Sequence, residues 1–281
     1  MYKVRASKTP YRIILSEGGK HEVFPYLRNE AGEEEMCCVS SHHGRSYIVG
    51  KTSSGRLVIS KGNGLSYSQY QLLHTGEFGD DTLGLLLKMD AERDFVMGQE
   101  IEALGIKTNH MEYVIELLME ITLTNGHKLN PVLLQYDVEC PYRICDAAFM
   151  TQELILSEVA KWERMNEHGF EKAHMIAANV LIRNLRILHD HRILHNAIHE
   201  QNYTWALELL DFELSCSPSH PYTSEDDRRH AKDLFSREIL QTYVIINYIA
   251  GVLREEIDFA EVDALFVEYG FNLKQYVVNV K

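Results

Sequence analysis

Asn202 and Asp211 are the two residues whose side chains together could hold a metal ion. Asn202 ends the polar segment HNAIHEQN, and Asp211 follows an apolar, β-prone segment from Tyr203 to Leu210. Mg²⁺ prefers oxygen ligands and commonly takes one or two protein groups together with nucleotide phosphates. A loop that ends on an amide and a strand that ends on a carboxylate therefore predict a site for Mg²⁺ and ATP. The structural alternative is a solvated Asn in a turn and an Asp that ends a strand.

Composition limits the classes of partner. The chain has 281 residues, 45% of them hydrophobic, and a formal net charge of -13. This charge argues against nucleic acid and anionic membranes as partners, since both attract basic surfaces. Five cysteines without a CxxC pair favour a reducing compartment. Because the N-terminal sequence lacks a sustained apolar core, we expect a cytoplasmic protein without a membrane partner.

A glycine-containing hairpin is expected in RSYIVGKTSSGRLVISKGNG, with GKTSSG at its tip. Gly50 and Gly55 would allow the backbone to approach phosphate oxygens closely, and Lys61 would end the second strand. A simple turn and a solvated lysine are the alternatives. A helix is expected from Asp90 to Leu104, with Gln99 and Glu100 as candidate acceptors for the strand lysine. The alternative is that Glu100 lies on a solvated face of this helix.

The periodicity of the apolar residues changes near the middle of the chain. MEYVIELLMEITLT and NPVLLQYDVE favour strands, whereas later segments favour helices from Thr151 to His168, from Glu171 to His189, after Ser224, and from Asp258 to Tyr269. We therefore predict an α+β, bilobal, protein-kinase-like fold. Its β-rich N-terminal lobe would span residues 1–138 and its helical C-terminal lobe residues 139–281.

Six segments in collinear order resemble the selenoprotein O family of protein adenylyltransferases, which have a kinase-like fold. The similarity spans roughly residues 39–212, through VSSHHGRSYIVGKTSSGR, KGNGLSYS, ALGIKT, YRIC, HNAIHEQN and LLDFE. The resemblance implies that ATP binds in an orientation flipped relative to ordinary kinases. It also implies that AMP is transferred to a hydroxyl of a protein substrate, whose identity the sequence does not give.

The resemblance also implies roles for individual residues. The expected phosphate-covering loop contains Gly50, Gly55 and Arg56. Lys61 and Arg143 would contact phosphates, and Asn202 with Asp211 would hold Mg²⁺.

The expected proton acceptor departs from the family pattern. The catalytic-loop acid of the family precedes the metal-binding Asn, and Gln201 stands there in this chain. Alignment with ordinary kinases places Ala197 at the base position, which leaves Glu200 and His199 as candidate bases. Three hypotheses follow: an adenylyltransferase with a rearranged base, a nucleotide-binding pseudoenzyme that acts through partner proteins, and a phosphotransferase acting on a small molecule or a protein.

Overall fold

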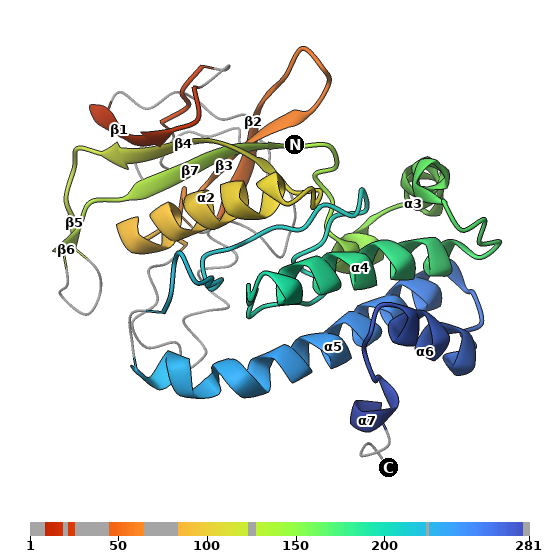
Figure 1. The fold of residues 1–281 in the computed structure, drawn as a ribbon. Helices are drawn as coiled ribbons and strands as arrows, with labels where there is room; N and C mark the ends of the chain where they lie inside the picture. Colours follow the sequence, from red (N-terminus) through yellow and green to blue (C-terminus); the bar gives the residue numbers. More distant parts are fainter. Residues whose placement is uncertain are drawn as a thin grey trace. The chain divides into compact units, whose positions relative to one another are not determined.

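The chain forms two compact units, whose helices and strands are labelled in Figure 1. The computed structural model describes residues 9–18, 22–25, 45–64, 84–122, 128–222 and 225–277, and within 225–234 it describes the backbone only. The first unit is drawn from Met1–Gln99 and Thr108–Tyr142, and the second from Glu100–Lys107 and Arg143–Lys281. All of VSSHH and the last four residues of KGNGLSYS lie outside the described residues. The lobe boundary expected at residues 138 and 139 stays a prediction.

The first unit contains seven described strands and most of one helix. In chain order these are β1 (Tyr11–Ser16), β2 (Ser46–Lys51), β3 (Leu57–Lys61), α2 (Lys88–Ala103), β4 (His110–Leu117), β5 (Ile121–Thr122), β6 (Lys128–Leu129) and β7 (Val132–Val138). The second unit contains α3 (Gln152–Val159), α4 (Ala173–Asp190), α5 (Glu225–Leu253), α6 (Phe259–Glu268), α7 (Lys274–Val277) and the 3₁₀ helices η2 (Ile144–Phe149) and η3 (Ala160–Met165).

A five-stranded antiparallel sheet forms the centre of the first unit, with strand order β1-β4-β7-β3-β2. Every residue of β7 is buried. Alternating side chains of β4 and β7, among them Ile115 and Leu133, form one apolar cluster. The expected strands in MEYVIELL and VLLQYDV are confirmed, because runs of apolar and β-branched residues suit strands that are buried on both faces.

The predicted hairpin is confirmed as β2 and β3, which pair from Ser46 with Lys61 to Lys51 with Leu57. Thr52 closes the tip by donating its N–H to the Arg56 carbonyl at 2.8 Å, and its hydroxyl accepts the Arg56 N–H at 2.9 Å. Lys61 therefore lies at the open end of the hairpin, away from the tip.

Gly62 follows Lys61 in a conformation and a space that only glycine fits. Its φ is +96°, and a Cβ there would lie 2.6 Å from the carbonyl oxygen of Val132 and 2.9 Å from Cγ of Leu86. The strand end that carries Lys61 thus lies tightly against β7, and any side chain at this position would push the two apart.

We expect Gly62→Ala to lower the free energy of unfolding by at least about 2 kcal/mol, because left-handed strain and overpacking add. Gly55→Ala is the matched control, since Gly55 also has a positive φ (+93°) but its Cβ would meet only the flexible end of Lys51 at 3.8 Å. Urea denaturation of the two variants measures the steric part as their difference. Equal losses would contradict the close packing at Gly62.

The second unit is mainly helical, as predicted. Its helix α4 contains Ala177, Leu181 and Leu188 on its apolar face, and Glu255 caps the start of α4 by accepting the N–H groups of Ala173 and His174 at 3.0 and 2.8 Å. Burial alone would raise the pKa of Glu255, but these donors outweigh it and lower that pKa.

The expected strand from Tyr203 to Leu210 is wrong. The segment makes only isolated bridges, from Thr204 to Arg143 and from Tyr203 to Leu209. Thr204 instead closes a local turn, in which its N–H donates to the Glu208 carbonyl at 3.0 Å and Leu207 has a φ of 58°. A left-handed residue ends an extended strand, whatever the β propensity of its neighbours.

Architecture and element order confirm the expected fold class, which is α+β and kinase-like. A β-rich unit carries one long helix between its third and fourth strands, and a helical unit follows. Among the described residues, no helix has both the length and the apolar character needed to span a membrane.

Candidate functional site

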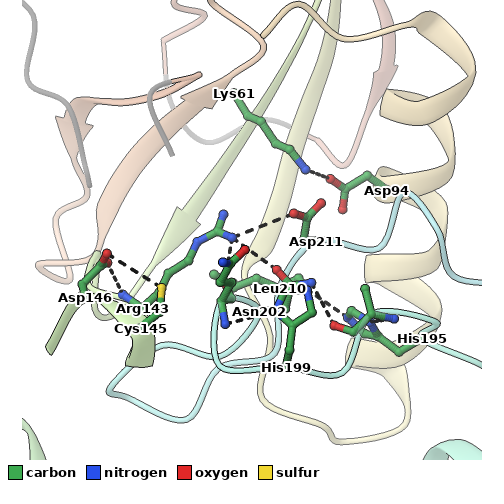
Figure 2. Close-up of polar contacts among 12 residues, drawn as sticks. Lys61, Asp94, Arg143, Cys145, Asp146, His195, His199, Asn202, Leu210 and Asp211 are labelled. Carbon is green, nitrogen blue, oxygen red and sulfur yellow. Dashed lines mark hydrogen bonds and ion pairs between the residues drawn. The ribbon is translucent and has the colours of Figure 1, made fainter. Parts of the chain in front are cut away.

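In the first unit, Lys61 forms a buried ion pair with Asp94 of α2. Lys61 Nζ lies 2.7 Å from Asp94 Oδ2, and each side chain is 2% exposed (Figure 2). A buried ammonium requires a charged partner, because its desolvation is otherwise too costly. The pair fixes the position of the Lys61 side chain at the end of β3.

The structure corrects the partner expected for this lysine, which was Glu100 or its neighbour Gln99. Asp94 lies on the buried face of α2 together with Ala91 and Met97, both fully buried. Residues three positions apart share a helix face, so these two neighbours place Asp94 on the side that meets the sheet.

Glu100 has different contacts, all within the second unit. Its carboxylate accepts a hydrogen bond from the Ser217 hydroxyl at 2.8 Å and lies 3.0 Å from Nδ1 of His220. It therefore anchors the segment that follows Asp211.

Gly50, Gly55 and Arg56 are not brought together with Lys61. Gly50 lies in β2 near the tip of the hairpin, Gly55 lies in the turn itself, and Arg56 directly precedes β3. The Arg56 guanidinium pairs through Nε with the Asp137 carboxylate and donates to the Asp137 carbonyl. Their assignment to a phosphate-covering loop stays a prediction, and Arg56 would have to leave Asp137 to act in it.

In the second unit, three of the predicted residues converge. Arg143 Nη1 donates to Asn202 Oδ1 at 3.2 Å and lies 3.9 Å from Asp211 Oδ2 (Figure 2). The same nitrogen donates to the carbonyl of Gln201 at 2.7 Å. A guanidinium, an amide and a carboxylate that are distant in sequence therefore share one small polar region.

Backbone pairing places Arg143 beside the HNAIHEQN loop. Ile144 donates its N–H to the Tyr203 carbonyl at 2.8 Å, and Cys145 donates to the Glu200 carbonyl at 3.1 Å. Burial, helped by nearby Asp146, raises the pKa of the Cys145 thiol to about 12. Cys145 consequently stays protonated near neutral pH and is unsuited to act as a nucleophile.

The Asn202 amide has a fixed orientation. Its Nδ2 donates to the Ala197 carbonyl at 2.9 Å, which leaves Oδ1 as the atom that faces Arg143. The backbone carbonyl of Asn202 accepts the N–H of Leu210 at 2.9 Å, and this bond brings Asp211 next to the loop. Asn202 Oδ1 and the Asp211 carboxylate, the two candidate metal ligands, are thereby brought close to each other.

His195 links the loop to the segment before Asp211. Its Nε2 donates to the Leu210 carbonyl at 2.9 Å, while Nδ1 accepts the Ala197 N–H at 3.3 Å, and its ring packs edge-on against Phe212. Complete burial lowers the pKa of His195, so the ring is neutral and donates at Nε2 only.

Asp211 itself has a φ of 69°, a left-handed conformation that Asp adopts more readily than most residues.

The buried state of His195 predicts a loss of stability in acid. The pKa of His195 lies below its ordinary value of 6.5 in the folded protein, so below about pH 6.5 the unfolded chain binds more protons. The contribution of His195 to the free energy of unfolding should therefore be fully present above this pH. It should fall as the pH is lowered, by up to about 1.4 kcal/mol per pH unit. Urea denaturation between pH 7 and 5 should show that the free energy of unfolding depends less steeply on pH in His195→Gln than in the wild type. An unchanged dependence on pH would contradict a buried, neutral His195.

Glu238 of α5 stabilises the start of the HNAIHEQN loop. Its Oε1 accepts the N–H of Asn196 at 2.7 Å, its Oε2 lies 3.0 Å from Nε2 of His189, and the residue is 1% exposed. Asn196 has a φ of 66°, so the loop turns sharply at the point where the carboxylate holds it. Sequence analysis missed Glu238, although a lone acid within the apolar stripe of α5 is a signal that could have identified it.

The two candidate bases differ in what they can do. The N–H of Gln201 donates to Nδ1 of His199 at 3.2 Å, and burial lowers the pKa of His199. The neutral ring therefore carries its proton on Nε2 and is a hydrogen-bond donor. The Glu200 carbonyl accepts the N–H of Cys145, and its side chain is a carboxylate, which can accept a proton, so Glu200 stays the candidate base and His199 is the candidate donor.

Comparisons with known proteins identify no family by sequence. No family model matches the chain, and no curated protein matches it. Among solved structures, the chain is similar to the kinase domain of a rhoptry antigen specific to Toxoplasma gondii, with 12% identity and a TM-score of 0.43 over 82% of this chain and 76% of that one. A likeness of this strength says nothing about ligand or activity. The resemblance to the selenoprotein O family therefore stays a hypothesis.

Proposed function

We propose that this protein binds ATP with Mg²⁺ and transfers a group from ATP to a hydroxyl. The observation that carries the proposal is the convergence of Arg143, Asn202 and Asp211 in the second unit. Asn202 and Asp211 fit Mg²⁺ because they offer two hard oxygen donors, and because the Asn202 nitrogen is committed to Ala197. When bound, the ion would neutralise phosphate charge.

The remaining roles belong to side chains of this chain. Arg143 suits phosphate oxygens, because a guanidinium donates in a fork that matches them. The resemblance to the selenoprotein O family assigns a phosphate contact to Lys61 as well, whose side chain Asp94 holds in the first unit. His199, as a donor at Nε2, would orient a phosphate or hydroxyl oxygen.

The finer proposal is transfer of AMP to a protein hydroxyl, supported by the family resemblance. In that reaction the hydroxyl oxygen attacks the α-phosphorus, the bond to the β-phosphate oxygen breaks, and pyrophosphate leaves. Glu200 accepts the hydroxyl proton. Phosphoryl transfer would instead break the bond between the γ-phosphorus and ADP.

A second candidate function is that of a nucleotide-binding pseudoenzyme. Ala197 and Gln201 favour it, because neither position where a catalytic acid is expected carries one. Positioning and charge stabilisation supply most of the catalysis in phosphoryl transfer, so loss of a base slows the reaction without abolishing it.

Parallel incubations with α-labelled and γ-labelled ATP test the proposal. Label retained on protein only from the α position means AMP transfer, and label only from the γ position means a kinase. Asp211→Asn is the control for both. If the wild-type protein binds ATP but transfers neither label, and Gln201→Asp does not restore transfer, the pseudoenzyme replaces the enzyme.

A further inference from the structure

A single guanidinium nitrogen occupies the space that the two candidate metal ligands share. Nη1 of Arg143 lies 2.7 Å from the Gln201 carbonyl, 3.2 Å from Asn202 Oδ1 and 3.9 Å from Asp211 Oδ2 (Figure 2). The Arg143 side chain is only 7% exposed. Three oxygen atoms thus face one positively charged nitrogen in a buried region.

A guanidinium in this position excludes a divalent metal ion from the same oxygens. Mg²⁺ needs its oxygen ligands at about 2.0–2.1 Å, and a guanidinium among the same oxygens would repel the ion. The Asn202 amide cannot turn away to resolve the conflict without losing its bond to the Ala197 carbonyl. Arg143 must therefore move before Asn202 and Asp211 can act as metal ligands.

We propose that Arg143 is an internal counter-ion that makes metal binding depend on the nucleotide. Without nucleotide, its guanidinium neutralises Asp211 and keeps divalent cations out. When ATP enters, phosphate oxygens attract the guanidinium away from Asn202 and Asp211, which frees these oxygens for the ion. This inference rests on the proposed function for its second half, but the first half concerns the free protein alone.

The chemistry of arginine favours this exchange. A buried guanidinium remains charged under all physiological conditions, so it can leave one anionic partner only for another. Phosphate offers two oxygens to its fork, whereas the contact of Arg143 with Asp211 runs from Nη1 to Oδ2 at 3.9 Å. The contact with Asp211 is therefore the weaker of the two and is suited to be replaced.

The test measures Mn²⁺ binding to the full chain without nucleotide, by electron paramagnetic resonance. We expect Arg143→Met to bind Mn²⁺ at least about tenfold more tightly than the wild type, since the competing charge is gone. Adding Asp211→Asn to this variant should cancel the gain. Arg186→Met is the matched control, because it removes an arginine from the exposed pair with Asp190 and should change nothing.

A purely structural role for Arg143 predicts the opposite result. If the guanidinium only stabilises the loop through its hydrogen bond to the Gln201 carbonyl, Arg143→Met should bind Mn²⁺ as weakly as the wild type or more weakly. This outcome would overturn the proposal. Arg143→Gln provides a second variant with a donor for that carbonyl but no charge, for use if Arg143→Met does not fold. It should also bind Mn²⁺ more tightly, and weaker or equal binding would overturn the proposal as well.

Repeating the titration with ATP separates this inference from the proposed function. With ATP present, the wild type should bind Mn²⁺ more tightly than without it, by about tenfold or more. In another outcome, the wild type shows the same Mn²⁺ affinity with and without ATP, while Arg143→Met binds Mn²⁺ more tightly than the wild type. This result would refute the proposed function and the nucleotide-driven exchange, but it would retain Arg143 as the counter-ion.

Discussion

Lys61→Met is expected to lower the free energy of unfolding by about 3–5 kcal/mol, because it leaves the Asp94 carboxylate buried without its ammonium partner. The pair is 2.7 Å long and both side chains are 2% exposed, so solvent cannot replace the lost contact. Urea denaturation, followed by a signal from the first unit, measures the loss. A change below about 1 kcal/mol would contradict a buried pair.

The double variant Lys61→Met with Asp94→Leu separates stability from ligand binding. Replacing both members of a buried ion pair by apolar residues is often neutral, so most of the stability should return. Nucleotide affinity should not return, because the phosphate contact assigned to Lys61 is worth about 1.5–3 kcal/mol as a charge-assisted hydrogen bond. Recovery of both properties would show that Lys61 is structural only.

Glu200→Gln is expected to lower the rate of group transfer by about 10²-fold or more, while nucleotide affinity stays nearly unchanged. The amide matches the carboxylate in shape but cannot accept the hydroxyl proton, so the loss falls in the transition state. Single-turnover transfer and direct ATP binding, measured on the same preparations, distinguish the two effects.

The companion variant for this prediction is His199→Gln. Because the His199 ring is neutral and donates at Nε2, an amide retains a donor, and transfer should fall less than in Glu200→Gln. A larger loss in His199→Gln, with Glu200→Gln unaffected, would transfer the role of base to the imidazole.

The sequence predicted those elements whose apolar pattern is decided locally. Strands β4 and β7 are rich in apolar residues, and α4 repeats its apolar residues at helical spacing, so burial and secondary structure agree. The hairpin of β2 and β3 was also predictable, because the turn residues and the flanking β-branched residues indicate the same geometry.

The partner of Lys61 differs from the prediction because the buried face of the helix, and not the position along its axis, decides which acid meets the lysine. Glu100 lies in the expected part of α2, but Asp94 is the acid with buried neighbours at Ala91 and Met97. Aligning the apolar face first would have identified it. The segment from Tyr203 to Leu210 failed differently: its β propensity was outweighed by a turn that depends on the Thr204 backbone and on left-handed Leu207.

The candidate site itself was predictable in part. Asn202 and Asp211 could be named from their sequence context, but their convergence depends on His195, whose bond to the Leu210 carbonyl joins two separate segments. The position of Arg143 between them depends on the pairing of its backbone with Thr204, which no local pattern specifies. Long-range hydrogen bonds of this kind become visible only in the folded chain.

Calorimetric titration of the full chain with ATP, in the presence and absence of Mg²⁺, tests the central claim most directly. Asp211→Asn is the matched variant, because Asn also tolerates the left-handed backbone at this position while it removes the charge. We predict saturable binding with Mg²⁺, weakened about tenfold or more when the ion is omitted or in Asp211→Asn, a loss of about 1.4 kcal/mol. No binding by the wild type, or equal affinity in all three cases, would contradict a metal and nucleotide site at Asn202 and Asp211.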